Sequence, residues 1–97
     1  MTSVLELSLF EIKAQNYIFS ELMNDYSYCE NDVETNMRLI AIFEKQIKLY
    51  NENVKIIRKN EQDVYKFFKN SQIEIKIYKE NIKICRYIVE DLIKSIN

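Results

Sequence analysis

The sequence of 97 residues contains no glycine, no proline, no histidine and no tryptophan. Tight hairpin turns usually need glycine or asparagine at positions of positive φ, and proline marks loops in most mixed folds, so a multistranded sheet is not expected. Without glycine, the chain also cannot form phosphate-binding loops, dinucleotide-binding turns or EF-hand loops. Because the two residues that most often interrupt helices are missing, the composition favours long α-helices.

The absence of histidine restricts the available chemistry. Histidine is the usual general base near neutral pH and the common ligand of zinc and di-iron sites in helical proteins. The two cysteines, Cys29 and Cys85, are far apart in the sequence and are expected to be small buried hydrophobes rather than a disulfide. An acidic cluster of Glu30, Asp32 and Glu34 is better explained as a helix start than as a cation site. We therefore expect no enzymatic activity, no cofactor and no metal.

Long apolar runs are missing too. The longest run is five residues, 39–43, whereas a membrane-spanning helix needs about 20. Residues 1–10 lack the basic segment that opens a signal peptide. Together with the low cysteine content, these features predict a cytoplasmic protein in a reducing compartment, without membrane contact.

Apolar residues follow a seven-residue repeat along the whole chain. With Leu5 at heptad position a, thirteen of the fourteen a positions are apolar or aromatic, and Glu61 is the exception. Most d positions are also apolar, whereas b positions are mostly charged or polar, which is typical of amphipathic helices. Apolar residues also occur at c positions, among them Ile42, Leu49, Ile56, Ile77 and Ile84. This arc is wider than a coiled-coil seam, so each helix is expected to contact two neighbours.

Helix boundaries are predicted from capping boxes, in which a polar residue precedes a glutamate by three positions. Three segments fit this pattern, at 3–6, 31–34 and 71–74. They predict an all-α fold with a single domain over residues 1–97, as a three-helix antiparallel bundle or an elongated helical hairpin. The predicted helices span about 4–29, 32–69 and 72–96. A further candidate break lies at 60–63, where Glu61 interrupts the apolar a row.

Two alternatives to this arrangement remain open. One is a single helix over 33–96, because the heptad register does not shift at residue 70. The other is two helices followed by a C-terminal β-hairpin over 73–84, where isoleucines alternate with polar residues and Asn81 supplies the turn. An isolated hairpin is only marginally stable and would need another element to cover it.

The predicted middle helix also suggests a homo-oligomer. A helix of about 38 residues would be about 57 Å long and would extend roughly 18 Å beyond its neighbours. Apolar residues of the overhang would then need a second chain to cover them. These residues are Val54, Ile57, Val64, Phe67 and Phe68.

Charge is unevenly distributed along the chain. Residues 1–36 contain one basic and seven acidic residues, whereas residues 37–97 contain 13 basic and eight acidic residues. Six lysines occupy outward heptad positions of the predicted middle helix: Lys45, Lys48, Lys55, Lys59, Lys66 and Lys69. This lysine stripe has the charge to contact phosphates, but it contains no arginine for reading base edges, so a solvated helix face is the favoured interpretation.

Aromatic residues provide the other candidate site. Tyr17, Tyr28 and Tyr87 fall at f or c positions, where they are either peripheral core or surface anchors for a partner protein. The function that these features favour is a small, self-associating, non-catalytic interaction protein that binds and occupies another protein. An accessory or inhibitor protein of a virus, phage or mobile element would fit this description. The alternative is a nucleic-acid-binding protein that uses the lysine stripe.

Overall fold

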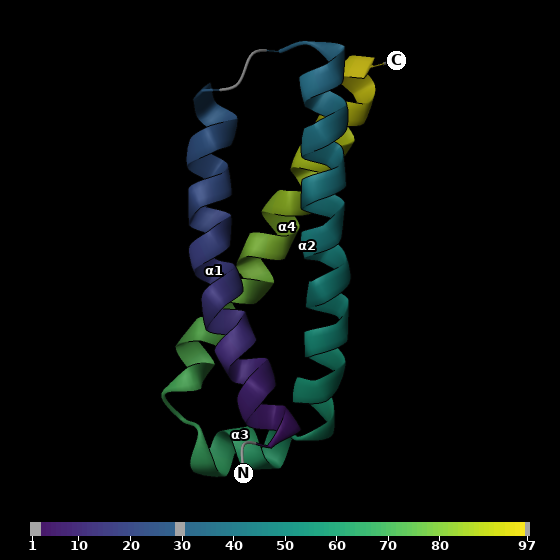
Figure 1. Cartoon of the computed structure of the whole chain (residues 1–97). Helices are drawn as coiled ribbons and strands as arrows, with labels where there is room; N and C mark the ends of the chain where they lie inside the picture. Colours follow the sequence, from purple (N-terminus) through teal and green to yellow (C-terminus); the bar gives the residue numbers. More distant parts are fainter. Residues whose placement is uncertain (1–2, 29–30, 97) are drawn as a thin grey trace.

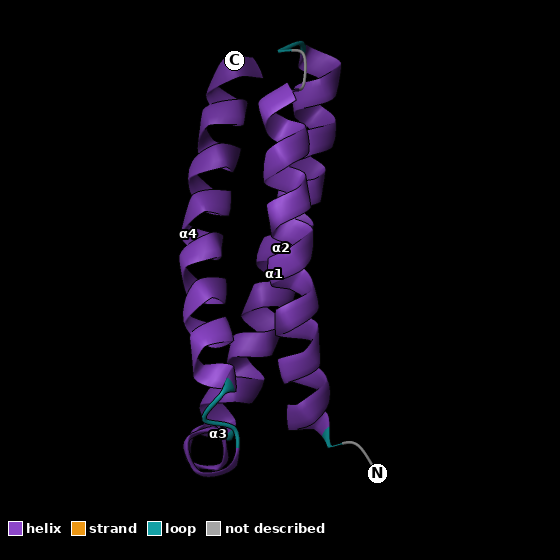
Figure 2. Cartoon of the chain, turned by 90° about the vertical axis from the view of Figure 1, so that its left-hand side faces the viewer, coloured by secondary structure: helices purple, strands orange, loops and turns teal. Residues whose placement is uncertain are grey.

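The computed structural model describes residues 3–28 and 31–96. This part of the chain forms four helices, α1 (Val4–Tyr28), α2 (Val33–Lys59), α3 (Glu61–Phe67) and α4 (Ser71–Ile96). In Figure 1, α1 and α4 run in one direction and α2 returns in the opposite direction, so the long helices form an antiparallel bundle. The bundle measures 47 × 22 × 21 Å, and α3 lies across its base, where Figure 2 shows it end-on. The predicted all-α fold is confirmed.

Side-chain caps define the starts of α1 and α2. The backbone N–H of Glu6 donates to Ser3 Oγ at 3.1 Å, as the capping box predicts. At α2 the cap is Asp32 rather than Asn31, because the backbone N–H of Thr35 donates to the Asp32 carboxylate at 2.8 Å. This hydrogen bond from the Thr35 backbone holds the pKa of Asp32 below its usual value. Asp32 therefore caps the helix.

The predicted helix over 32–69 is wrong, because the chain turns at Asn60. The Asn60 side chain donates to the Ile56 carbonyl at 2.8 Å and its backbone N–H donates to the Ile57 carbonyl at 3.1 Å, so two carbonyls freed at the end of α2 are satisfied. A straight continuation would have placed Glu61 in the buried a row, where an unpaired carboxylate is strongly unfavourable. After the turn, Glu61 is exposed at the start of α3.

The two alternative arrangements are not supported. Residues 73–84 lie within α4, and no strand occurs in the ranges that the structure describes. A single helix over 33–96 is likewise not formed, because the chain leaves helical geometry at Asn60 and again between α3 and α4. The isoleucine alternation has a different origin: Ile75 faces the core while Ile73 and Ile77 remain exposed. α4 is thus a helix with apolar side chains on two faces.

The break at Asn60 also removes the overhang on which the oligomer prediction was based. α1, α2 and α4 contain 25, 27 and 26 residues, so each is about 40 Å long. Val54, Ile57 and Val64 are buried within the chain itself. Phe68 is half-buried against the core and Phe67 is 68% exposed on α3, but no long helix overhangs its neighbours in the described part of the chain.

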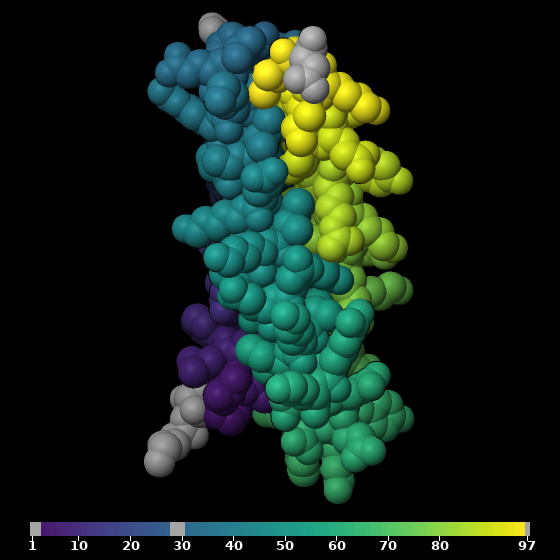
Figure 3. Space-filling model, turned by 90° about the vertical axis from the view of Figure 1, so that its right-hand side faces the viewer, coloured from purple at the N-terminus to yellow at the C-terminus, as the bar shows by residue number. Residues whose placement is uncertain are grey.

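The core consists of two clusters, one toward each end of the bundle. The first combines Phe19 of α1 with Leu39 and Phe43 of α2 and five residues of α4, and Phe43 is fully buried. The second lies next to α3 and is formed mainly by Leu5, Leu9, Ile12, Ile57, Val64, Ile75 and Tyr78. Figure 3 shows α2 and α4 packed side by side over the length of the molecule. Each long helix contacts the other two.

Buried hydrogen bonds connect the three long helices toward the α3 end of the bundle. Ser8 Oγ of α1 donates to Asn53 Oδ1 of α2 at 2.8 Å, and Asn53 Nδ2 donates to the Tyr78 hydroxyl of α4 at 3.3 Å. All three residues are buried. Because a buried polar group without a partner is costly, this chain of hydrogen bonds favours one alignment of the helices over shifted ones.

A second group of hydrogen bonds joins α1 directly to α4. Asn16 Nδ2 donates to the carbonyl and to the carboxylate of Glu74, both at 2.9 Å, and Asn81 Nδ2 donates to Asn16 Oδ1 at 3.0 Å. The Glu74 carboxylate therefore contacts α1, although the sequence pattern assigned it to a capping box with Ser71. α1 and α4, which are parallel neighbours, are aligned by these contacts.

Replacing Asn53 tests the buried hydrogen bonds. We expect Asn53→Ala to lower the free energy of unfolding by about 1–3 kcal/mol, because the Ser8 and Tyr78 hydroxyls lose their partner inside the core. Urea denaturation measures this change. Asn51→Ala, at an exposed position on the same helix, is the matched control and should change stability by less than about 0.5 kcal/mol. Equal effects of both variants would contradict this role of Asn53.

The environment of Tyr78 predicts a loss of stability in alkali. Burial raises the pKa of Tyr78 from 10.0 to about 12. The unfolded chain then releases its proton first, so the free energy of unfolding falls as the pH rises from 10 toward 12. Urea denaturation across this pH range should give a shallower pH dependence for Tyr78→Phe than for the wild type. The same slope in both proteins would contradict the prediction.

Candidate binding surfaces

α1 carries apolar side chains on its outer face as well as on its core face. Leu7, Phe10, Ala14 and Tyr17 are spaced by three, four and three residues, and we call these four residues the α1 stripe. At about 100° per residue they fall within an arc of roughly 80°, opposite the core residues of the same helix. Leu7, Phe10 and Tyr17 are 57%, 75% and 69% exposed. The α1 stripe therefore has coiled-coil spacing, and within residues 3–28 and 31–96 no second helix covers it.

The sequence pattern identified only part of this surface. Tyr17 was predicted as a partner-binding candidate, and it lies in the α1 stripe. Leu7 and Phe10 were missed, although they occupy the same c and f heptad positions. The side chain of Tyr28, another candidate, is outside the described residues. The c and f rows, followed along one helix, were the signal that would have identified the whole stripe.

Acidic residues flank the α1 stripe. α1 contains four acidic residues and one basic residue, Lys13. Glu11 lies along one edge of the stripe, and Asp25 continues this edge beyond Tyr17. Glu6 and Lys13 share the other edge, and Glu21 continues the stripe itself one turn beyond Tyr17. The outer face of α1 is therefore an apolar surface with one acidic margin and one margin that carries both Glu6 and Lys13.

α4 has a comparable outer surface, which includes the predicted candidate Tyr87. The α4 stripe consists of Ile73, Ile77, Ile84 and Tyr87, all exposed and on the side of α4 away from the core. Ile77 and Ile84 were expected to pack against a second neighbour, but each is 42% exposed. Glu80 interrupts the stripe and lies 3.4 Å from the Lys83 ammonium group. Three long helices are too few to cover every apolar c position.

The predicted lysine stripe is divided between elements. Lys45, Lys48, Lys55 and Lys59 lie on α2, Lys66 lies on α3 and Lys69 lies between α3 and α4, and all six are exposed. Beyond the turn at Asn60, the Lys66 ammonium group is 5.6 Å from the Phe67 ring and that of Lys69 is 5.9 Å from the Tyr65 ring. The last two lysines thus follow the direction of α3 and the loop instead of continuing the α2 row.

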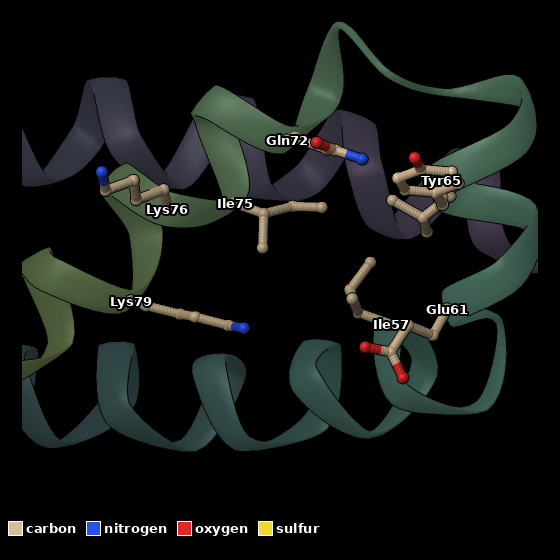
Figure 4. Close-up of a pocket in the computed structure, with 8 residues that line it drawn as sticks. Ile57, Glu61, Tyr65, Gln72, Ile75, Lys76 and Lys79 are labelled. Carbon is tan, nitrogen blue, oxygen red and sulfur yellow. The ribbon is translucent and has the colours of Figure 1, made fainter.

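An open pocket of about 320 Å³ lies where α2, α3 and α4 meet (Figure 4). Ile57, Val64 and Ile75 form its apolar floor. In Figure 4 the side chains of Lys79 and Glu61 extend toward the space between the helices, whereas Lys76 points away from it. The rim therefore carries charges of both signs. The pocket has no electrostatic preference for an anionic or a cationic ligand.

Cys85 lies in the core as part of the first cluster. Burial raises the pKa of its thiol to about 11, so the thiol is protonated near neutral pH and is a weak nucleophile. Cys29 lies outside the described residues. Within the described ranges, no three or more of the histidine, cysteine and acidic side chains are grouped closely enough to hold a metal ion.

Comparison with known proteins gives no relative for this chain. No protein family model matches it, and no significant match was found among curated proteins or solved structures. None of the helices in the described part of the chain combines the length and apolar character that crossing a membrane requires.

Proposed function

We propose that this chain is a small, non-catalytic protein interaction module that acts by occupying the surface of a partner protein through the α1 stripe. The observation that supports the proposal is the exposure of Leu7, Phe10 and Tyr17 at coiled-coil spacing on one helix face. Contiguous apolar surface of this kind marks interaction sites in soluble proteins. Complete burial of a side chain such as Leu7 or Phe10 against a partner contributes about 1.5–3 kcal/mol.

The proposal includes self-association, for which the α4 stripe is the supporting feature. If two α4 helices pack antiparallel around Glu80, Ile73 of one copy lies near Tyr87 of the other, and Ile77 lies near Ile84. Lys83, 3.4 Å from Glu80 in the same chain, offsets the acidic charge at the centre of such a contact. We also place the protein in a reducing intracellular compartment, since Cys85 is a buried thiol.

The α1 and α4 stripes can be tested by capture of partners from an extract of the source cell, followed by mass spectrometry. We expect Tyr17→Ser combined with Tyr87→Ser to lower the amount of captured partner about tenfold, because aromatic anchors contribute most to such interfaces. Tyr65→Ser is the matched control, since Tyr65 is 67% exposed on α3. Equal loss with the control would show that these stripes have no special role.

The lysines separate this function from nucleic-acid binding. We expect substitution of Lys55, Lys59, Lys66 and Lys69 by glutamine to leave partner capture nearly unchanged. Binding to DNA or RNA should be weak and should disappear at about 0.2 M salt, because it depends on phosphate contacts alone. Tight binding at that salt concentration, lost on substitution of the lysines, would establish the nucleic-acid alternative instead.

Light scattering tests self-association. We expect a mass above the 11.8 kDa of one chain at high protein concentration, and a monomer for the double variant Ile77→Ser, Ile84→Ser. Ile42→Ser is the control, because Ile42 is similarly exposed on α2. A wild-type monomer at all concentrations would contradict the proposed homo-oligomer without affecting partner binding through α1.

A further inference from the structure

We infer that the α1 stripe binds a basic amphipathic helix of another protein. This inference rests on the proposed function, and it adds the chemistry of the partner: apolar residues at three- and four-residue spacing, flanked by lysine or arginine.

The spacing indicates that the occupant is a helix. Leu7, Phe10, Ala14 and Tyr17 alternate spacings of three and four residues, which is the repeat by which two helices pack side by side. Peptide strands, in contrast, present side chains at a repeat of two and dock against sheet edges, which this fold does not offer in its described part. Ala14, in the middle of the stripe, has a small side chain that allows a second backbone to approach closely.

The charges at the margins indicate that the partner helix is basic. Glu11 and Asp25 lie on one side of the stripe, and Glu6 lies on the other side together with Lys13, the single basic residue of α1. These positions correspond to e and g of a coiled coil, whose charges decide which helices pair. A helix with lysine or arginine at its flanking positions would form favourable pairs with Glu11 and Asp25 at one margin and with Glu6 at the other, where Lys13 is the one opposing charge.

A second copy of this chain is a poorer occupant because like charges meet in both orientations. In an antiparallel contact that places Leu7 opposite Tyr17 of the second copy, Glu11 faces Glu11 and Lys13 faces Lys13. In a parallel contact, Glu21 faces Glu21 in the seam and Glu6 lies near Glu11. Juxtaposed like charges oppose association, so the α1 stripe discriminates against itself.

The direct test uses three synthetic peptides of about 21 residues, which form a helix of about 31 Å. The first has leucine at the seam positions and lysine at the flanking positions. The second has glutamate in place of the lysines, and the third has the composition of the first in scrambled order. Fluorescence anisotropy with the full-length protein should show the lysine peptide binding at least about tenfold more tightly than either of the others.

Variants of the protein assign the binding to the α1 stripe. Tyr17→Ser should weaken binding of the lysine peptide about tenfold, whereas Tyr65→Ser, at a similarly exposed tyrosine on α3, should not. The double variant Glu11→Lys, Asp25→Lys should reverse the preference, so that the glutamate peptide binds more tightly than the lysine peptide. Circular dichroism confirms that each variant retains its helices.

The outcomes distinguish this inference from the proposed function. Equal binding of the lysine and glutamate peptides, lost in Tyr17→Ser, would overturn the basic partner while leaving the α1 stripe as a binding surface. Equal binding of the lysine and scrambled peptides would show attraction by charge alone and overturn the helix as occupant. A homodimer that dissociates in Tyr17→Ser but not in Tyr65→Ser would identify a second copy as the occupant. If no peptide binds and Tyr17→Ser leaves partner capture intact, both proposals fail.

Discussion

The architecture depends on the position of one charge in the apolar a row. Continuing α2 through Glu61 would bury a carboxylate in the core, and the chain instead turns at Asn60, whose side chain and backbone satisfy the freed carbonyls of Ile56 and Ile57. The turn limits α2 to the length of its neighbours and directs α3 across the base of the bundle. It also returns the chain so that α4 runs parallel to α1.

The polar groups in the core then restrict how the three helices align. Apolar heptads alone permit shifts by whole turns, because leucine, isoleucine and valine pack acceptably in several registers. Ser8, Asn53 and Tyr78 satisfy one another only in one alignment, and Asn16 with Glu74 and Asn81 does the same for α1 and α4. Asn16, Asn53 and Asn81 thus help to align the three long helices.

The candidate binding surfaces exist because three long helices cannot cover all the apolar residues of this sequence. A three-helix bundle buries one arc on each helix, and the apolar arc of this sequence is wider than that. On α2, Leu49 and Ile56 are half-buried at the edge of the core. On α1 and α4, the remaining apolar residues form stripes that face outward. The acidic margin formed by Glu11 and Asp25 distinguishes the α1 stripe from the α4 stripe, where charges of both signs lie along the helix.

The heptad pattern and the absence of glycine and proline determined the all-α class and the positions at which α1, α2 and α4 begin, because these depend on local periodicity and on capping residues next in sequence. The same pattern left open whether the helix ends at 59 or 69, since Glu61 is unfavourable only if the a row is buried. Whether Tyr17 and Tyr87 are core or surface was also undecided by periodicity. Only the tertiary structure decided these points, because burial depends on how many helices share a core, and that number is a property of the packed chain and not of any one segment.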